Sequence, residues 1–314
     1  MSPIIIGVDT GNRQIKTATQ VFTSGIQVSD TQSGIFQDND TIRYGGQYYT
    51  PTMARDSYKR DKTIDDDYFV LTLFAVVREL RERGIDPARS DEPTKVVLVV
   101  GLPPAHLVRQ KDRFREYFNR GEVSFEYNGS PIVLDIVNVH VLIQGYSAIL
   151  GSYSEIRKLK SAYIIDIGGY TTDVIGVLNG NTNPSICFSE DDGMIHLYNR
   201  IHNAMNVKFD SVPSESQIEE LLADPSYGDE LDEGMADVAS EQAREYVKEL
   251  LLKLREKKVD LRLSKGIFVG GGSSRLKAYI ESSELVRNPM FITDIKANAI
   301  GYETIVRFKY SKRG

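Results

Sequence analysis

Three short stretches of the chain are almost continuously apolar, and each runs into a turn that contains glycine. The stretches span residues 3–8, 162–167 and 265–269. An uninterrupted apolar run of this length is typical of a β-strand covered on both faces, because a strand with one solvated face alternates apolar and polar residues. The pattern therefore predicts an α/β protein with buried strands that end in glycine-containing turns.

Each of the first two buried strands is followed, after a short turn, by another strand, over 15–22 in the first half and 172–178 in the second. This succession is typical of a hairpin, and it argues against a Rossmann domain, in which a helix follows the first strand. Asp9 and Asp166 lie at the two turns, half a chain length apart, and a glycine follows each by two residues. A duplicated domain is the simplest explanation.

Apolar residues at helical spacing, together with turn signals, define the remaining elements. We predict helices over 69–83, 104–119 and 240–258, from about 275 to 282, and from about 297 onward. A buried strand is predicted over 95–100, and a hairpin over 123–127 and 131–137 is closed by Asn128-Gly129.

Two segments differ from this pattern. Residues 29–67 are polar, and we interpret them as a peripheral insertion with a small hairpin over 41–44 and 47–50. Residues 209–243 contain eleven acidic residues and no Lys or Arg. A charge run of this kind is typical of a solvated face, so it predicts a second insertion rather than a specific cation site.

Composition and charge narrow the function classes. The chain has 314 residues, of which 41% are hydrophobic and 26% charged, as is typical of a globular protein of two domains. Lys and Arg number 38 against 44 Asp and Glu, which gives a net charge of −6. An acidic chain is a poor general binder of nucleic-acid backbones, so we expect no direct contact with nucleic acid.

A single cysteine, Cys187, excludes an internal disulfide, and no Cys or His cluster indicates zinc. The N-terminal residues lack the basic region of a signal peptide, and the longest apolar segment, 69–77, is too short to cross a bilayer. We therefore expect a cytoplasmic protein with no membrane partner.

The three glycine turns are candidates for phosphate binding. Glycine lets backbone amides approach a phosphate closely, and successive amides in a turn form an anion nest. A carboxylate beside such a nest repels phosphate unless a cation lies between them, so Asp9 and Asp166 indicate Mg²⁺ held through water molecules. Lys16, on the returning strand, supplies a further positive charge.

These turns, in this order, resemble those of the actin, sugar-kinase and DnaK-type chaperone superfamily. Residues 6–16 resemble its first phosphate loop, 164–173 its second and 266–274 its adenosine loop. The finer resemblance is to bacterial actin-like proteins of the ParM/StbA plasmid-segregation type. It rests on the Ile-Ile-Asp-x-Gly-Gly-x-Thr-x-Asp form of the second loop, the triple glycine, Leu102-Pro103 and the closing Asn-x-x-Gly at 298–301.

The resemblance implies an actin-like fold in which two ribonuclease-H-like domains, each with a small insertion, surround a nucleotide cleft. Domain I would comprise 1–143 and 299–314, with the insertion at about 29–67. Domain II would comprise 144–298, with the acidic insertion at about 198–242. The helix from about 297 would return to domain I.

The resemblance also assigns roles to residues. Asp9 and Asp166 would order the water ligands of Mg²⁺, and Lys16 would contact the phosphates of ATP. Gln144 would orient the attacking water, with His140 as a competing candidate, and Asp173 would only brace its loop. The phosphates would lie against Thr10, Gly11, Asn12, Gly168, Gly169 and Tyr170, and the adenosine against Gly270, Gly271, Gly272 and Ser273.

The function implied by the resemblance is an ATPase that forms filaments with copies of itself and segregates or positions plasmid DNA. A DNA-binding adaptor protein would link it to the plasmid centromere. A small-molecule kinase of the same superfamily is the alternative, but such an enzyme needs a carboxylate base, and none is found beyond the two Mg²⁺ candidates. A nucleotide-binding regulator that neither polymerises nor hydrolyses ATP is a third possibility.

Overall fold

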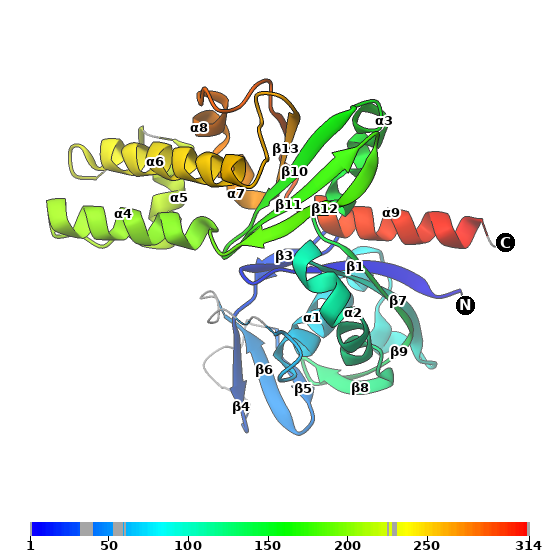
Figure 1. Cartoon of the computed structure of the whole chain (residues 1–314). Helices are drawn as coiled ribbons and strands as arrows, with labels where there is room; N and C mark the ends of the chain where they lie inside the picture. The colour runs from blue at the N-terminus through cyan, green and yellow to red at the C-terminus, as the bar shows by residue number, and fades with distance from the viewer. Residues whose placement is uncertain are drawn as a thin grey trace. The chain divides into compact units, whose positions relative to one another are not determined.

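The computed structural model describes residues 2–31, 40–52, 59, 61–224, 226–227 and 231–312. The chain divides into two compact units (Figure 1). Unit 1 comprises Met1–Gly151 and Lys296–Gly314, and unit 2 comprises Ser152–Ile295. The division into functional domains at 143/144 and 298/299 remains a prediction, because compactness alone defines these units.

The sheet of unit 1 has the strand order β3-β2-β1-β7-β9-β8-β5-β6-β4. Its central strands β1, β7 and β9 are parallel to one another, and the other pairs are antiparallel. The strands are β1 (Ile4–Thr10), β2 (Gln14–Lys16), β3 (Val21–Thr23), β4 (Ile26–Ser29), β5 (Ile42–Tyr44), β6 (Gln47–Pro51), β7 (Thr94–Leu102), β8 (Gly121–Tyr127) and β9 (Ser130–Ile143).

Helices cover both faces of this sheet. Alternate residues of a strand point to opposite faces, and in β7 Leu98 packs under α1 (Asp67–Glu82) and α2 (Pro104–Phe118). The intervening Val97 and Val99 pack on the other face, against Tyr302 of α9 (Ala297–Ser311). The predicted C-terminal helix therefore does return to the first part of the chain. Two short 3₁₀ helices, η1 (Pro87–Arg89) and η2 (Ser147–Ser152), complete the described elements of this region.

One expectation for unit 1 was wrong. The strand predicted over 15–22 is two short strands, because the Thr17 hydroxyl accepts a hydrogen bond from the Gln20 amide at 2.9 Å and turns the chain. The small hairpin predicted within the polar segment is present as β5 and β6, and it extends the main sheet at one end: β5 pairs with β8, and Ile42 is fully buried. Part of this segment, residues 32–39, 53–58 and 60, lies outside the described residues.

The sheet of unit 2 has the order β12-β11-β10-β13-β14, with β10, β13 and β14 parallel. Its strands are β10 (Ser161–Ile167), β11 (Thr172–Leu178), β12 (Asn181–Glu190), β13 (Lys265–Val269) and β14 (Met290–Ile292). Its helices are α3 (Tyr153–Ile156), α4 (Met194–Phe209), α5 (Glu215–Ala223), α6 (Met235–Glu256), α7 (Gly270–Arg275) and α8 (Lys277–Glu281). As in unit 1, a central strand pairs antiparallel with its successor and parallel with a later strand, which fits the predicted duplication.

Among the described residues of the acidic segment 209–243, no acidic residue is buried, as expected for a solvated face, but the segment also contains a helix, α5, that was not predicted. The segment is largely helical, and α5 packs Ile218, Leu221 and Leu222 into the core of the unit beside α4 and α6. Its first turn is closed by a capping box, in which Ser214 and Gln217 satisfy each other's backbone amides. The acidic side chains occupy the outward face, while apolar residues at i, i+3 and i+4 form the buried one.

Candidate functional site

The first turn follows β1 and carries its polar groups in a buried setting. The Asp9 carboxylate is only 3% exposed, and its Oδ2 lies 3.7 Å from Nζ of Lys16, its register partner on β2. The adjacent Thr10 is also buried, and its Oγ1 has no hydrogen-bond partner among the described residues. Gly11 follows Thr10, and Asn12 accepts a hydrogen bond from the Tyr68 hydroxyl at 2.9 Å.

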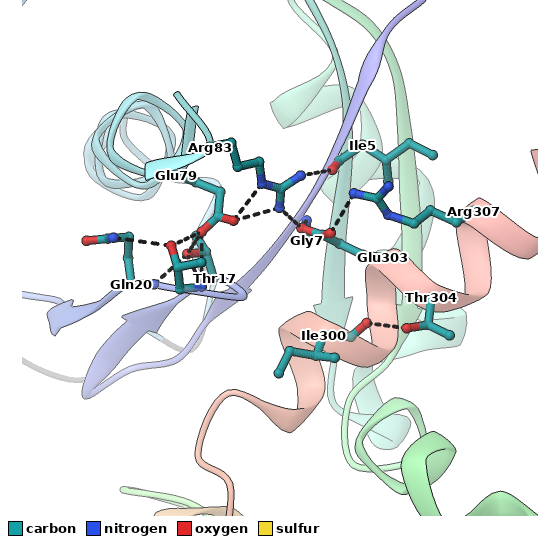
Figure 2. Close-up of polar contacts among 11 residues, drawn as sticks. Ile5, Gly7, Thr17, Gln20, Glu79, Arg83, Ile300, Glu303, Thr304 and Arg307 are labelled. Carbon is teal, nitrogen blue, oxygen red and sulfur yellow. Dashed lines mark hydrogen bonds and ion pairs between the residues drawn. The ribbon is translucent and has the colours of Figure 1, made fainter. Parts of the chain in front are cut away.

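A buried ion-pair network holds the hairpin that carries Asp9 and Lys16 (Figure 2). Glu303 of α9 accepts a hydrogen bond from the Gly7 amide at 3.1 Å, two residues before Asp9. The guanidinium of Arg83, which directly follows α1, bonds to Glu303 and, at 2.8 Å, to Glu79. Glu79 also accepts the hydroxyl of Thr17, which directly follows Lys16. The network therefore fixes both strands of the hairpin just below the Asp9–Lys16 pair.

Glu79 is ionised within this network. Burial by itself raises the pKa of this fully buried carboxyl, but hydrogen bonds from Thr17 and Thr19 and the Arg83 charge outweigh burial and hold the pKa below its usual value. The carboxylate form therefore has a full set of partners, and its negative charge is compensated.

Gln144 lies at the same sheet edge as Asp9. It directly follows β9, and its amide donates to the Leu102 carbonyl at 3.0 Å, so its backbone is fixed to the end of β7. Because β1, β7 and β9 are parallel, their carboxyl ends meet at one edge, and two strand spacings separate the β1 and β9 backbones by about 10 Å. The following residue, Gly145, donates to Asn298 at 2.8 Å, so the closing Asn-x-x-Gly segment braces the chain after Gln144.

His140 lies in a different setting. It is in register with Val99 in the middle of β7, and its ring packs edge-on against Tyr310 of α9 at 6.1 Å between ring centres. The residue is therefore inside the sheet, four positions before the strand end at which Gln144 lies. This geometry favours Gln144 over His140 as the group at the edge.

In unit 2, Asp166 occupies the place that Asp9 has in unit 1. It is 5% exposed and is flanked in register by Asp173 of β11 and Val269 of β13. Asp173 accepts the Ser189 hydroxyl, and Thr171 approaches it at 3.4 Å, which fits a bracing role for this second carboxylate. The central strand β10 thus presents Asp166 at its carboxyl end.

The second turn, at Gly168, Gly169 and Tyr170, is fixed to the start of α4. The Gly168 amide donates to Thr171 at 2.8 Å, and the carbonyls of Gly168 and Gly169 accept the amides of Met194 and Ile195 at 3.0 and 2.9 Å. The residues that brace the turn from α4 were not singled out from the sequence, because they lie more than twenty positions further along the chain.

The triple glycine differs from its prediction in one respect. We expected a turn with a helix from about residue 275, but the helix begins at Gly270 itself, and the Ser273 hydroxyl bonds back to the Val269 carbonyl at 2.5 Å. Gly270 has φ +88°, and a Cβ there would lie 2.3 Å from Asp166 Oδ1. At Gly271, by contrast, a Cβ would meet only Ile295, at 4.0 Å. In the third turn, Asp166 therefore leaves no room for a side chain at Gly270, whereas a side chain at Gly271 would meet only Ile295.

The groups at the first turn fit Mg²⁺ and a phosphate. Carboxylate oxygens such as those of Asp9 are the ligands that Mg²⁺ prefers, and the Thr10 hydroxyl, which has no hydrogen-bond partner among the described residues, would offer a hydrogen bond to a bound oxygen. Within the described part of the chain, no three His, Cys, Asp or Glu residues are grouped so as to hold a metal by themselves. No helix among the described residues is long and apolar enough to span a bilayer.

Two family models match successive parts of the chain. The model of the actin like proteins N terminal domain matches residues 7–146, and that of the archaeal actin homologue MreB-like C-terminal domain matches residues 164–282. Comparison with curated proteins found no match.

Solved structures cover nearly the whole chain at low identity. Ta0583, an archaeal actin homolog that was also solved in complex with ADP, has a TM-score of 0.76 at 19% identity over 97% of this chain and 99% of its own. ParM in a 15-stranded filament from Clostridium botulinum has a TM-score of 0.74 at 18% identity over 98% and 100%.

Bacillus thuringiensis ParM with AMPPNP has a TM-score of 0.67 at 16% identity, over 99% of this chain and 100% of its own. The predicted fold class is confirmed: with both halves matched by models of actin-type domains and these structures covering almost every residue, the chain has a mixed α/β actin-like fold with two domains.

Proposed function

We propose that this chain binds and hydrolyses ATP with Mg²⁺ and assembles into filaments whose lifetime depends on that hydrolysis. The observation that carries the proposal is the recurrence of one arrangement in both units: a buried aspartate, Asp9 or Asp166, at the carboxyl end of the central strand, followed by a glycine turn. Ligands of α/β sheets bind at the carboxyl ends of parallel strands.

Each of the candidate site residues would have a different role in the binding and hydrolysis of ATP. Asp9 and Asp166 would hold the water ligands of Mg²⁺, which neutralises phosphate charge when bound. Lys16 and the backbone amides of the two turns would hold phosphate oxygens, and the open side of Gly271 would face the adenosine. The neutral amide of Gln144 would orient water for attack but would not act as a strong base.

The filament part of the proposal rests on the similar proteins. ParM from Clostridium botulinum and Alp12 were both solved as filaments. A head-to-tail contact between identical subunits produces an open filament when its symmetry does not close. We propose the same assembly for this chain in the cytoplasm, and a role in segregating plasmid DNA through a DNA-binding adaptor, since a net charge of −6 disfavours direct DNA contact.

The test combines light scattering with phosphate release. With ATP and Mg²⁺, scattering should rise and later fall as phosphate is released, and Asp166→Asn should lower turnover at least about a hundredfold because a charged Mg²⁺-water contact is lost. Asp237→Asn, an exposed change on α6, is the matched control and should behave as wild type.

Two results would contradict the proposal. Wild-type turnover in Asp166→Asn would remove Asp166 from the site. Scattering that stays flat while phosphate passes from ATP to a small alcohol would replace the filament ATPase by the small-molecule kinase.

A further inference from the structure

Exposed cations gather at the edge of the unit 2 sheet where β10 begins. The Asn179 amide donates to the Lys160 carbonyl at 3.0 Å, so the turn between β11 and β12 lies against the segment that precedes β10. The Ser161 and Ser264 hydroxyls lie 2.9 Å apart, which brings the loop after α6 to the same edge. We call the exposed residues of these three segments the basic edge: Arg157, Lys158, Lys160, Leu178, Lys258 and Leu263.

The basic edge combines positive charge with exposed apolar side chains. Its cations form no ion pair among the described residues, and they outnumber the exposed carboxylates of the same segments, those of Glu155 and Glu256. A further carboxylate there, that of Asp260, is already paired with two arginines. Leu178 is 53% exposed and Leu263 is 85% exposed. Large apolar side chains exposed together within a charged rim are typical of a surface that another protein covers.

The opposite end of α6 carries the complementary charge. This helix begins beside the end of α4, since a Cβ on Gly234 would lie 3.8 Å from Nζ of Lys208. Val207 and Val212, at the end of α4 and just after it, are 88% and 68% exposed. We call the exposed acidic and apolar residues at this end the acidic tip: Val207, Asp210, Val212, Asp232 and Glu233. Its three carboxylates outnumber the Lys208 ammonium, so the tip is negatively charged.

The helix α6 keeps the two surfaces apart. It has 22 residues and therefore spans about 33 Å, from the acidic tip to within two residues of Lys258. Figure 1 shows α4 and α6 side by side in this unit. Two complementary surfaces at opposite ends of one unit meet only between different copies of the chain. A contact of this kind, repeated from copy to copy, produces an open filament.

We propose that the basic edge of one copy docks on the acidic tip of the next, and that this contact joins the copies head to tail. The proposal rests on the proposed filament function and deepens it by naming the surfaces that meet. Opposite charges would steer the copies together and fix their direction. The leucines of the edge and the valines of the tip would bury apolar area in the contact, which supplies affinity. All copies in a filament would then point the same way.

The experiment measures the critical concentration for assembly with Mg²⁺-AMPPNP by pelleting, at low ionic strength, where exposed charges are least screened. Lys158→Glu with Lys160→Glu reverses the basic edge, and Asp232→Lys with Glu233→Lys reverses the acidic tip. Each double variant alone should raise the critical concentration at least about tenfold, because attraction across the contact becomes repulsion. An equimolar mixture of the two should assemble at close to the wild-type concentration, because each reversed surface then meets a reversed partner.

Arg244→Glu with Lys248→Glu is the matched control for the basic edge. It changes the net charge by the same amount at exposed positions in the middle of α6. Its critical concentration should stay within about twofold of wild type. Thermal unfolding and AMPPNP binding of every variant should match wild type, because the altered side chains are exposed.

Three results would count against the proposal. Unchanged critical concentrations in both reversed variants would overturn the contact and leave the basic edge to an acidic partner other than this chain. Losses that the mixture does not repair would also overturn it, because the two surfaces would then not meet each other. A wild-type chain that does not assemble with ATP or AMPPNP would instead overturn the proposed filament function, and this contact with it.

Discussion

At the scale of the single residue, both the backbone conformation of Gly270 and its surroundings exclude a side chain. Its φ of +88° is unfavourable for any side chain, and a Cβ would lie 2.3 Å from the Asp166 carboxylate. Gly270→Ala should therefore lower the free energy of unfolding by about 2–4 kcal/mol. The measurement is denaturant unfolding of the full chain.

Gly271→Ala provides the contrast, because a Cβ there would meet only Ile295, at an ordinary contact distance of 4.0 Å. Its stability should remain within about 1 kcal/mol of wild type. If adenosine lies against this glycine, the same variant should bind ADP more weakly. Equal losses in the free energy of unfolding of the two variants would contradict the destabilisation expected from the contact with Asp166.

Gln144→Ala tests mechanism rather than folding. If the side chain orients the attacking water, its loss should slow phosphate release roughly tenfold to a thousandfold and leave ATP affinity nearly unchanged. Filaments should then assemble with ATP and persist, because assembly follows binding while disassembly waits for hydrolysis. Unchanged release and unchanged filament lifetime, measured on one preparation, would retire Gln144 from this role.

A residue of the site could be predicted from the sequence where it belongs to a short motif. Asp9, Lys16 and Asp166 belong to short patterns, and the structure places each at a strand end or beside it. The partly buried Arg83–Glu303 pair could not be found this way, because no local pattern links a residue to a partner 220 positions away. Only the folded backbone brings them together.

At the scale of the element, the hairpin β1–β2 depends on α1. Glu79 on α1 has a lowered pKa, so its ionised form is more stable in the folded chain than in the unfolded one. This contribution to stability is complete above the ordinary pKa of about 4.5 and is lost as the pH falls through the lower folded value.

Glu79→Gln should therefore destabilise the chain at pH 7, and its deficit relative to wild type should shrink below about pH 4. Glu82→Gln, an exposed change on the same helix, should show neither effect. Denaturant unfolding at several pH values measures both. A deficit that stays constant down to pH 3 would mean that Glu79 is not the acid-sensitive group.

Elements were predicted correctly where a run of apolar residues marks them. Buried strands such as β10 and β13 were predicted because their sequences are almost continuously apolar. The split into β2 and β3 was missed because it follows from a polar side chain: the Thr17 hydroxyl accepts from the Gln20 amide, and Glu79, 62 positions away, holds that hydroxyl. In α5 the signal was local. The capping box at Ser214 and the spacing of Ile218, Leu221 and Leu222 already indicate a packed helix. The helix was not predicted because the acidic charge of the segment favoured a solvated insertion.

At the scale of the whole molecule, contacts between the beginning and the end of the chain complete unit 1. Its sheet is made from the first half of the chain, yet α9 covers Val97 and Val99 of β7, and Glu303 caps the Gly7 amide 296 positions earlier. The fold class was predictable because the motifs recur in a fixed order. Of the buried contact between the beginning and the end of the chain, only the return of the C-terminal helix was predictable.

The late position of α9 in the sequence has a consequence for the synthesis of the chain. A ribosome makes the chain from residue 1 onward, so β1 and β7 emerge long before α9 does. Unit 2 is a continuous segment, Ser152–Ile295, and can complete its core while the helix-free face of unit 1 is still open. The nascent chain therefore carries an exposed strip of valines until residues 297–311 leave the exit tunnel, and chaperones that bind apolar surface should act on it during that interval.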